Sequence, residues 1–95
     1  MHARVILGMV KLDKQDEATK IYKESLEPAA KEQKGFKGMY LLTDPDTRKF
    51  ISITIWENEN DMLAGETSGY LQEQLDKIVA LFVGPPSIQN YIVSD

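Results

Sequence analysis

The sequence contains no cysteine and a single histidine, His2. Without thiols the chain cannot form disulfides, iron–sulfur clusters, thiolate-bound zinc sites or a cysteine nucleophile. The acidic pairs Asp44/Asp46 and Glu57/Glu59 are better explained by a turn and a helix start than by a calcium loop, whose spacing is missing. We therefore expect no metal and no cofactor.

Excess positive charge and long apolar segments are lacking as well. The chain has 11 Lys and Arg against 15 Asp and Glu, a net charge of −4, so it lacks the basic surface that nucleic-acid binding requires. Its N-terminal apolar stretch is broken by Gly8 and Lys11, and predicts neither a signal peptide nor a membrane span. We expect a soluble, cytoplasmic protein with no nucleic-acid or membrane partner.

The length of 95 residues fits one domain, residues 1–95, because single cores are typically of about 100 to 150 residues. With 42% hydrophobic residues the chain can build a compact but small core. Its stability should be modest unless a partner covers further apolar surface.

Hydrophobic periodicity and turn residues predict four strands and two main helices. A short helical turn, which Asn58 or Asn60 caps and Gly65 ends, should lie between them. The turn residues 44–47, Asp-Pro-Asp-Thr, predict a tight hairpin. The expected strands are residues 3–10, 36–43, 49–57 and 87–93, and the expected helices are residues 13–34 and 68–82.

The first helix carries three local signals. Asp13 is expected to cap its N-terminus, and Gly35 to stop it after Lys34. Pro28 lies inside the pattern and should kink or break the helix, because proline lacks a backbone donor. In the second main helix, Leu71, Leu75, Ile78, Val79 and Phe82 form an apolar stripe.

The element order β-α-β-β-α-β predicts an α+β, ferredoxin-like fold, with a four-stranded antiparallel sheet and both helices on one face. The strands are nevertheless apolar on both faces: Val5 and Leu7 alternate with Ile6, for example. The face away from the helices therefore needs a cover. We expect a second copy to supply it, in a two-fold homodimer whose sheets form a dimeric α+β barrel.

The third strand offers the best candidate for a pocket wall. Phe50, Ser52, Thr54 and Trp56 share one face of it, and the three isoleucines between them share the other. Apolar surface with a few polar groups is typical of binding sites, and an aromatic ring can stack on Trp56 or Phe50. The same pattern also fits an ordinary core with common strand-forming residues.

Arg4 and the tyrosines add polar candidates. Arg4 can hold a phenolate or semiquinone anion, and Tyr22, Tyr40, Tyr70 or Tyr91 can orient a phenol or accept its proton. Each can equally be structural, and the single histidine lies too near the terminus to be a well-held base. No catalytic residue is assigned, and the candidate substrate-binding residues are Arg4, Tyr40, Phe50, Ser52, Thr54, Trp56 and Tyr70.

Residues 35–61 resemble a known family. Gly-Phe-Lys-Gly at 35–38, Asp-Pro-Asp at 44–46, Ile-Trp-Glu-Asn at 55–58 and Asp-Met at 61–62 are similar to the "GF-x-G … W-E-S-x-E-D" pattern of the antibiotic biosynthesis monooxygenase family. The element order agrees over nearly the whole chain. The resemblance implies a dimeric α+β barrel.

The resemblance also implies an activity. Family members oxygenate quinol-like or polycyclic phenolic molecules without metal or flavin, because the electron-rich substrate itself reduces dioxygen. A haem-degrading branch uses an asparagine, a tryptophan and a histidine at positions that fall here near Gly8 or Met9, Gly65 and Leu75. Since these residue types are missing, we do not expect haem chemistry.

Three functions remain open. The first is a cofactor-independent monooxygenase acting on a quinol or an aromatic, polycyclic phenolic small molecule together with dioxygen. The second is a non-catalytic small-ligand-binding or regulatory dimeric barrel, and the third is a structural dimer filled by its own side chains. The sequence contains no strong acid–base pair that would favour the first function over the other two.

Overall fold

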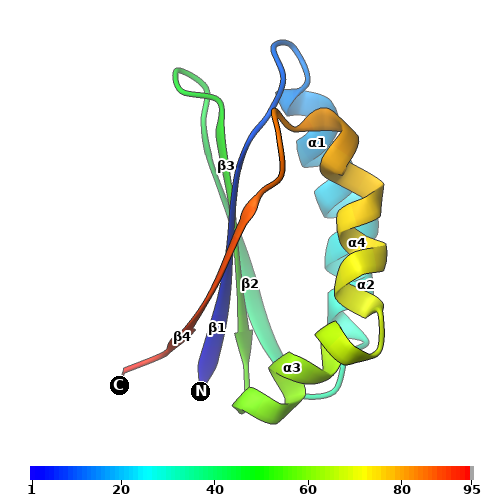
Figure 1. The fold of residues 1–95 in the computed structure, drawn as a ribbon, viewed down its shortest axis with the longest axis vertical. Helices are drawn as coiled ribbons and strands as arrows, with labels where there is room; N and C mark the ends of the chain where they lie inside the picture. The colour runs from blue at the N-terminus through cyan, green and yellow to red at the C-terminus, as the bar shows by residue number, and fades with distance from the viewer. Residues whose placement is uncertain (95) are drawn as a thin grey trace.

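A four-stranded antiparallel sheet in the order β2-β3-β1-β4 is the base of the fold. In the computed structural model, which describes residues 1–94, the helices of those residues all lie on one side of this sheet (Figure 1). This confirms the predicted ferredoxin-like α+β fold. The elements are β1 (His2–Met9), α1 (Gln15–Ile21), the π-helical turn η1 (Tyr22–Leu26), α2 (Glu27–Lys31), β2 (Phe36–Asp44), β3 (Lys49–Trp56), α3 (Glu59–Thr67), α4 (Tyr70–Ile78), the 3₁₀ turn η2 (Val79–Leu81) and β4 (Ser87–Ile92).

The predicted hairpin is confirmed as β2 and β3. Asp46 donates its backbone N–H to the Asp44 side chain at 3.0 Å, and Arg48 adopts a left-handed φ of 62° where the turn returns to β3. The central strand β1 then pairs with β3, placing His2 opposite Trp56 and Met9 opposite Lys49. Because β1 lies between β3 and β4, it holds the two halves of the sheet together.

Two predictions about the ends of the first helix were wrong. Asp13 does not cap it, because this residue takes a left-handed φ of 65° in a turn in which the Lys14 N–H bonds to the Lys11 carbonyl. The helix also ends at Lys31 rather than Lys34, where its last turn tightens and the Gln33 N–H bonds to a carbonyl three residues back.

Pro28 interrupts the regular α-helix without ending the helical winding, and it lies in the first turn of α2. The turn before it is widened, and the Glu27 N–H bonds to the carbonyl of Tyr22, five residues earlier. A proline ring in a regular α-helix crowds the carbonyl four residues before it. The π-helical turn relieves that crowding, so α1, η1 and α2 follow one another as one wound segment.

The second half of the chain departs from the sequence pattern at two glycines. Asn58 caps α3 as expected, its Oδ1 accepting the Asp61 N–H at 2.8 Å. Gly65, predicted to end this helix, lies inside it, and α4 begins only after Gly69, which has a φ of 86°.

The predicted apolar stripe of the second main helix is confirmed for Ile78, which is buried. It is wrong for Val79, which is 37% exposed in the closing 3₁₀ turn.

The core lies between the sheet and the helices. Its aromatic centre is Phe50, whose ring meets that of Tyr22 at 5.8 Å and that of Phe82 at 5.6 Å between centroids. Gly8 of β1 leaves room for Phe82, because an added Cβ there would lie 2.8 Å from the ring. The buried residues of the cluster around Phe50 are Val10, Ala18, Tyr22, Phe50, Ile78 and Phe82.

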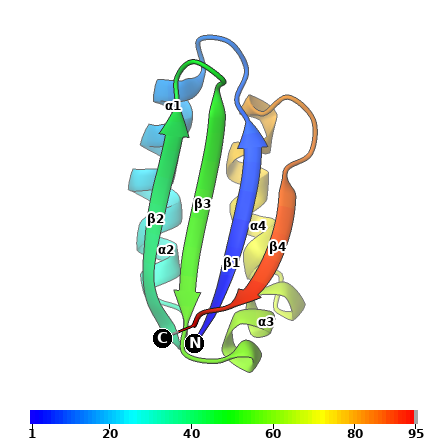
Figure 2. The same ribbon diagram turned by 90° about the vertical axis from the view of Figure 1, so that its left-hand side faces the viewer.

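The opposite face of the sheet, which we call the open face, is not covered by the helices of the described residues (Figure 2). Pairing puts Tyr40 beside Ile53 and Leu42 beside Ile51, so that β2 and β3 contribute apolar side chains to the same face. Tyr40 is 63% exposed and Leu42 is 48% exposed.

Within residues 1–94, no helix has the length and apolar character that a membrane crossing requires.

Replacing Gly35 with alanine should destabilise the fold more than the same change at Gly69. Both glycines have a left-handed φ, of 82° and 86°, but an added Cβ at Gly35 would collide with the Asp61 side chain, whereas Gly69 faces open space. We expect a loss of about 1 kcal/mol for Gly69→Ala and about 2–3 kcal/mol for Gly35→Ala. Urea unfolding of both variants measures the difference, and equal losses would contradict the contact with Asp61.

Candidate functional site

A small cavity lies between the sheet and the helices. Its volume is about 40 Å³, which is room for about three water molecules. The lining comes from both layers: β1, β2 and β3 on one side, and η1, α2 and α4 on the other. The lining residues are Arg4, Ile6, Tyr22, Leu26, Ala30, Met39, Ser52, Thr54, Trp56, Tyr70, Leu71 and Gln74.

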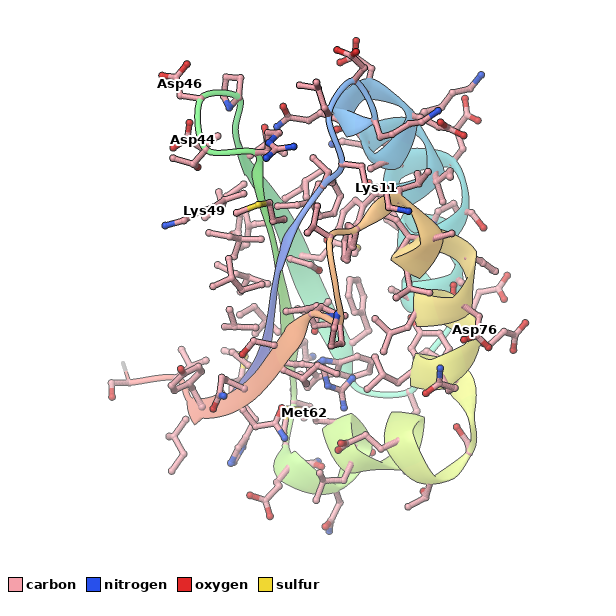
Figure 3. The ribbon with its side chains drawn as sticks, turned by 45° about the horizontal axis from the view of Figure 1, so that its top comes forward. Lys11, Asp44, Asp46, Lys49, Met62 and Asp76 are labelled. Atoms are coloured by element: carbon pink, nitrogen blue, oxygen red, sulfur yellow. The ribbon has the colours of Figure 1, made fainter. Side chains whose placement is uncertain are left out.

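Arg4 is the charged group of this cavity, and it is only 2% exposed. Its Nη2 donates to the Met62 carbonyl at 2.7 Å and lies 3.5 Å from a Glu66 carboxylate oxygen. Met62 lies where α3 meets the end of the sheet (Figure 3), so these contacts tie β1 to α3. Burial lowers the pKa of Arg4, while Glu66 raises it; the guanidinium remains cationic at any ordinary pH.

Trp56 forms the floor of the cavity beside Arg4. Its Nε1 donates to Thr54 Oγ1 at 2.9 Å, which fixes the indole on the strand. The Arg4 guanidinium carbon lies 6.0 Å from the centre of the indole ring, at the outer limit of a cation–π contact. Phe36 packs against the same ring edge-on, at 5.7 Å between centroids.

Tyr22 and Ser52 form the second polar pair in the lining. Their hydroxyl oxygens lie 2.9 Å apart, and the Tyr22 hydroxyl also donates weakly to the Tyr40 carbonyl at 3.4 Å. Tyr22 is the first residue of the π-helical turn, a feature that is frequent at functional sites. Burial raises the pKa of the Tyr22 phenol, and the bond from Ser52 lowers it.

Tyr70 is the cavity's remaining phenol. It begins α4 and packs against Gly65, where an added Cβ would lie 3.2 Å from the Tyr70 ring and 3.8 Å from Arg4 Nη1. Glycine at position 65 therefore allows α3 to approach both side chains. Burial raises the pKa of Tyr70 to about 12, with Arg4 opposing the shift, so Tyr70 is a neutral hydrogen-bond donor over the physiological range.

The structure brings most of the candidate residues together. Arg4, Ser52, Thr54, Trp56 and Tyr70 all line the cavity. Their sequence separation is bridged by the β1–β3 pairing, which places Arg4 directly opposite Thr54.

The other candidates lie elsewhere. Phe50 is on the same sheet face but lines a neighbouring cavity of about 30 Å³. The side chain of Tyr40 belongs to the open face, because this residue pairs with Ile53. Tyr91 is 53% exposed, and His2 Nε2 lies 3.5 Å from a Glu59 carboxylate oxygen.

Sequence reasoning missed Gln74 and the contacts of Arg4 with α3. Gln74 is 7% exposed and accepts a bond from Lys77 Nζ at 3.1 Å. Its position three residues after Leu71 and four before Ile78 places it on the apolar stripe, which was the available signal. The Met62 acceptor carried no signal, because any residue type presents a backbone carbonyl.

The cavity lacks an obvious proton acceptor. Of the residues that the structure describes, those lining it include no carboxylate and no histidine. Its chemistry is therefore one cation, two neutral phenols, two aliphatic hydroxyls, an indole and an amide on an otherwise apolar wall. Such a wall can position a small molecule and stabilise negative charge on it.

A sequence model of the antibiotic biosynthesis monooxygenase family matches residues 1–75. The match spans most of the chain, including β1, β3 and α3. The chain belongs to this family. The resemblance seen between residues 35 and 61 is thereby confirmed.

Solved structures of antibiotic biosynthesis monooxygenases share this fold at low sequence identity. A putative member from Bordetella bronchiseptica has a TM-score of 0.84 and 15% identity, covering 98% of this chain and 96% of its own. SnoaB from Streptomyces nogalater, a cofactor-independent oxygenase, has a TM-score of 0.81 and 14% identity, with coverage of 99% and 93%. The ActVA-Orf6 monooxygenase from Streptomyces coelicolor, in complex with nanaomycin D, has a TM-score of 0.76 and 19% identity, with coverage of 99% and 88%. A search of curated proteins finds no match.

The alkaline titration of this family member should reveal the half-buried phenol of Tyr70. Its pKa of about 12 exceeds the ordinary value of 10.0, so between pH 10 and 12 the unfolded chain loses this proton while the folded chain keeps it. The stability that Tyr70 contributes is complete below pH 10 and is lost as the pH rises toward 12. Absorbance at 295 nm should show a tyrosine component near pH 12 that Tyr70→Phe removes, and an unchanged curve in that variant would contradict the assignment.

Proposed function

We propose that the chain is a cofactor-independent monooxygenase of a small quinol or phenolic molecule, which it holds in the cavity between the sheet and the helices. The observation that supports this proposal most directly is that Arg4, Tyr70 and the hydrogen-bonded Thr54–Trp56 pair all line that cavity. A cation and a neutral donor beside an indole suit an aromatic ring with an acidic hydroxyl. The fold relatives described as a cofactor-independent oxygenase and as a monooxygenase with bound nanaomycin D support this choice.

In this proposal the protein positions the substrate and supplies the electric field that acts on it. The Tyr70 hydroxyl donates to the ring oxygen, and the Arg4 charge stabilises the deprotonated, electron-rich form. Because the wall is mostly apolar, water is excluded and the charge acts at short range. The proton leaves to solvent as the substrate enters, since the described lining offers no carboxylate or histidine to take it.

The reaction balances without another reductant. A phenol and dioxygen give a quinone and water: one oxygen atom becomes the new carbonyl, and the other leaves as water with the two hydrogens lost by the substrate. The ring supplies all four electrons that dioxygen accepts. Dioxygen must therefore meet the ring while the substrate anion is shielded from water.

A ring requires more space than the cavity has in this state. A dry cavity of about 150 Å³ holds benzene, whereas this one measures about 40 Å³. Binding must therefore move α4 or η1 away from the sheet. Such movements accompany binding in a substantial minority of complexes, and the left-handed Gly69 between α3 and α4 is a suitable pivot.

The proposal includes a homodimer formed through the open face. Leu7, Met9, Tyr40 and Leu42 are each at least 38% exposed there, and the β3 isoleucines lie between them. Figure 2 shows β2, β3 and β1 side by side, so these side chains come from neighbouring strands of the sheet. An apolar face of this extent is unusual on a monomer, and a second copy presents a face of the same shape and chemistry.

The alternative is a non-catalytic dimer that binds or senses a small ligand. It is favoured by the small cavity and by the absence of a proton acceptor from its described lining. The two proposals share the fold, the cavity and the dimer. They differ only in whether bound ligand consumes dioxygen.

Oxygen uptake distinguishes them. We expect the metal-free protein to accelerate oxygen consumption with at least one member of a panel of hydroquinones and polycyclic phenols. Tyr70→Phe and Trp56→Phe should each lower that rate by about tenfold or more, because each removes a contact with the ring or its oxygen. Tyr91→Phe is the matched control outside the cavity and should leave the rate unchanged.

Binding of the same panel, measured by equilibrium dialysis, completes that experiment. Ligand binding without oxygen uptake would overturn the monooxygenase and support the ligand-binding dimer. Uptake that survives in both cavity variants would place the reaction elsewhere on the protein.

Sedimentation equilibrium at micromolar concentration should give twice the chain mass. Leu42→Lys should yield the monomer, because a lysine there would bury an unpaired charge between the two sheets. The control is Leu12→Lys, since Leu12 is 71% exposed and lies outside the sheet. A monomeric wild type, or a dimeric Leu42→Lys variant, would contradict the proposed interface.

A further inference from the structure

A second, smaller cavity lies beside the one that Arg4 lines. We call them the Arg4 cavity, of about 40 Å³, and the Phe50 cavity, of about 30 Å³. Both lie between the sheet and the helices. Four lining residues are common to the two cavities: Ile6, Tyr22, Leu26 and Ser52. Because only shared side chains separate them, the two cavities become one space when those side chains move.

The pairing of β1 with β3 arranges the cavities one after the other along the sheet. The successive pairs on the helix-covered face are Arg4–Thr54, Ile6–Ser52 and Gly8–Phe50. The first pair lines the Arg4 cavity, and the middle pair lines both cavities. Thr54 and Phe50 lie about 13 Å apart along the strand. A ligand that reaches from one to the other is therefore longer than a single ring.

The Phe50 cavity is almost wholly apolar. Phe50 and Phe82, whose ring centroids are 5.6 Å apart, form one part of its wall, and α4 contributes Leu75. Of the residues that the structure describes, those lining it include only two with polar side chains, the shared Tyr22 and Ser52. A polar group inside would lose its water and find no partner beyond that pair. The cavity therefore suits a hydrocarbon group.

The volume limits this hydrocarbon to a short chain. The Phe50 cavity measures about 30 Å³, which is room for about two water molecules and hence for about two or three carbon atoms in line. An aromatic ring is too large, since a dry cavity that holds benzene measures about 150 Å³. The sheet leaves no spare room behind Phe82, because even a Cβ added at Gly8 would lie 2.8 Å from its ring.

The Tyr22–Ser52 hydrogen bond closes the passage between the two cavities. The hydroxyl oxygens lie 2.9 Å apart, and both residues are buried. Tyr22 begins η1, so the movement of η1 that would admit a ring to the Arg4 cavity also draws Tyr22 away from Ser52. A chain that enters the Phe50 cavity must displace this bond, which cancels part of what is gained by burying the chain.

We propose that the Phe50 cavity is the distal part of the ligand site and takes a short, unbranched alkyl chain of the bound phenol, with Tyr22 and Ser52 as the gate between chain and ring. The inference rests on the proposed function for the position of the ring, whose hydroxyl lies toward Arg4 and Tyr70. It adds a feature of the substrate, an alkyl substituent opposite that hydroxyl. It requires neither dioxygen nor turnover.

Binding of para-substituted phenols under argon tests the site. The series is phenol, para-ethylphenol and para-propylphenol, with para-isopropylphenol as the branched isomer of the last. Equilibrium dialysis gives the dissociation constants, and the fluorescence of Trp56, the only tryptophan, reports that the ring has entered the Arg4 cavity. We expect para-propylphenol to bind about tenfold more tightly than phenol, because each buried methylene contributes about fourfold and opening the gate cancels part of the gain. The branched isomer should bind at least about threefold more weakly than the straight chain, because the volume admits carbon atoms only in line.

A double variant of the gate should increase the preference for the straight chain. Tyr22→Phe combined with Ser52→Ala removes both hydroxyls, so that no polar atom of the pair is left unpaired. The ratio of the dissociation constants of phenol and para-propylphenol should rise about three- to tenfold above the wild-type ratio, since the chain no longer displaces a hydrogen bond. The affinity for phenol itself, which does not reach the gate, should stay within about twofold of the wild type.

Variants of Leu75 locate the chain. Leu75 lines the Phe50 cavity and not the Arg4 cavity, so Leu75→Phe should fill the former and reduce the preference for para-propylphenol to about one. Leu75→Ala should shift the tightest binding to para-pentylphenol, and this variant needs no room for a larger side chain. The matched control is Leu81→Phe, since Leu81 is also a half-buried leucine at the core but lines neither cavity. Circular dichroism verifies the fold of each variant.

The outcomes separate this inference from the proposed function. A straight-chain preference that Leu75→Phe removes, Leu81→Phe retains and the gate variant increases supports the distal site. Phenol binding without a gain from the chain, or a gain that is the same in Leu75→Phe and Leu81→Phe, would overturn the distal site and leave the phenol site of the proposed function standing. Binding of no phenol would overturn both. Oxygen uptake is judged in its own experiment, so the monooxygenase can fail while the distal site stands.

Discussion

The buried charge of Arg4 is the constraint on which the arrangement of this protein depends. A guanidinium that is 2% exposed must find partners inside the fold, and it finds them on α3: the Met62 carbonyl at 2.7 Å and Glu66 at 3.5 Å. These contacts fix α3 against the end of β1. They also explain the buried glycine at position 65, because a side chain there would push α3 away from Arg4 and Tyr70.

The two faces of the sheet are built for different purposes. On the helix-covered face, β3 presents Phe50, Ser52, Thr54 and Trp56, so that polar atoms occur among apolar ones and each needs a defined partner. On the open face the same strand presents three isoleucines, which need only to be covered. Alternation along one strand thus separates a cavity that can discriminate ligands from a surface suited to association.

Much of this could be predicted from the sequence because it depends on local rules. The hairpin follows from Asp44-Pro45 between two apolar runs, and the face shared by Ser52, Thr54 and Trp56 follows from the period of a strand. The prediction that Asp13 caps the first helix was wrong because the loop sets a left-handed backbone at that residue. Gly65 failed as a helix end because its role is set by tertiary contact with Tyr70, which a local rule does not contain.

The candidate site was less predictable because it depends on register. Whether Tyr40 faces the cavity or the open face is decided by its pairing with Ile53, and a shift of one residue would reverse it. The acceptor for Arg4 is a carbonyl 58 residues away, and such long-range partners have no signature in residue type. The cavity volume depends on how closely the helices approach the sheet, which side-chain patterns do not fix.

Tyr22 connects a local backbone feature, the π-helical turn, with the size of the cavity. The cavity beside Arg4 and the smaller one beside Phe50 share four lining residues, Ile6, Tyr22, Leu26 and Ser52. Tyr22 is held in place by Ser52 at 2.9 Å and by the π-helical turn that Pro28 requires. The two cavities can join only if these shared side chains move, so the Tyr22–Ser52 bond opposes the entry of anything larger than a few atoms. A proline that interrupts a helix thereby helps to set the size of the ligand that the cavity admits.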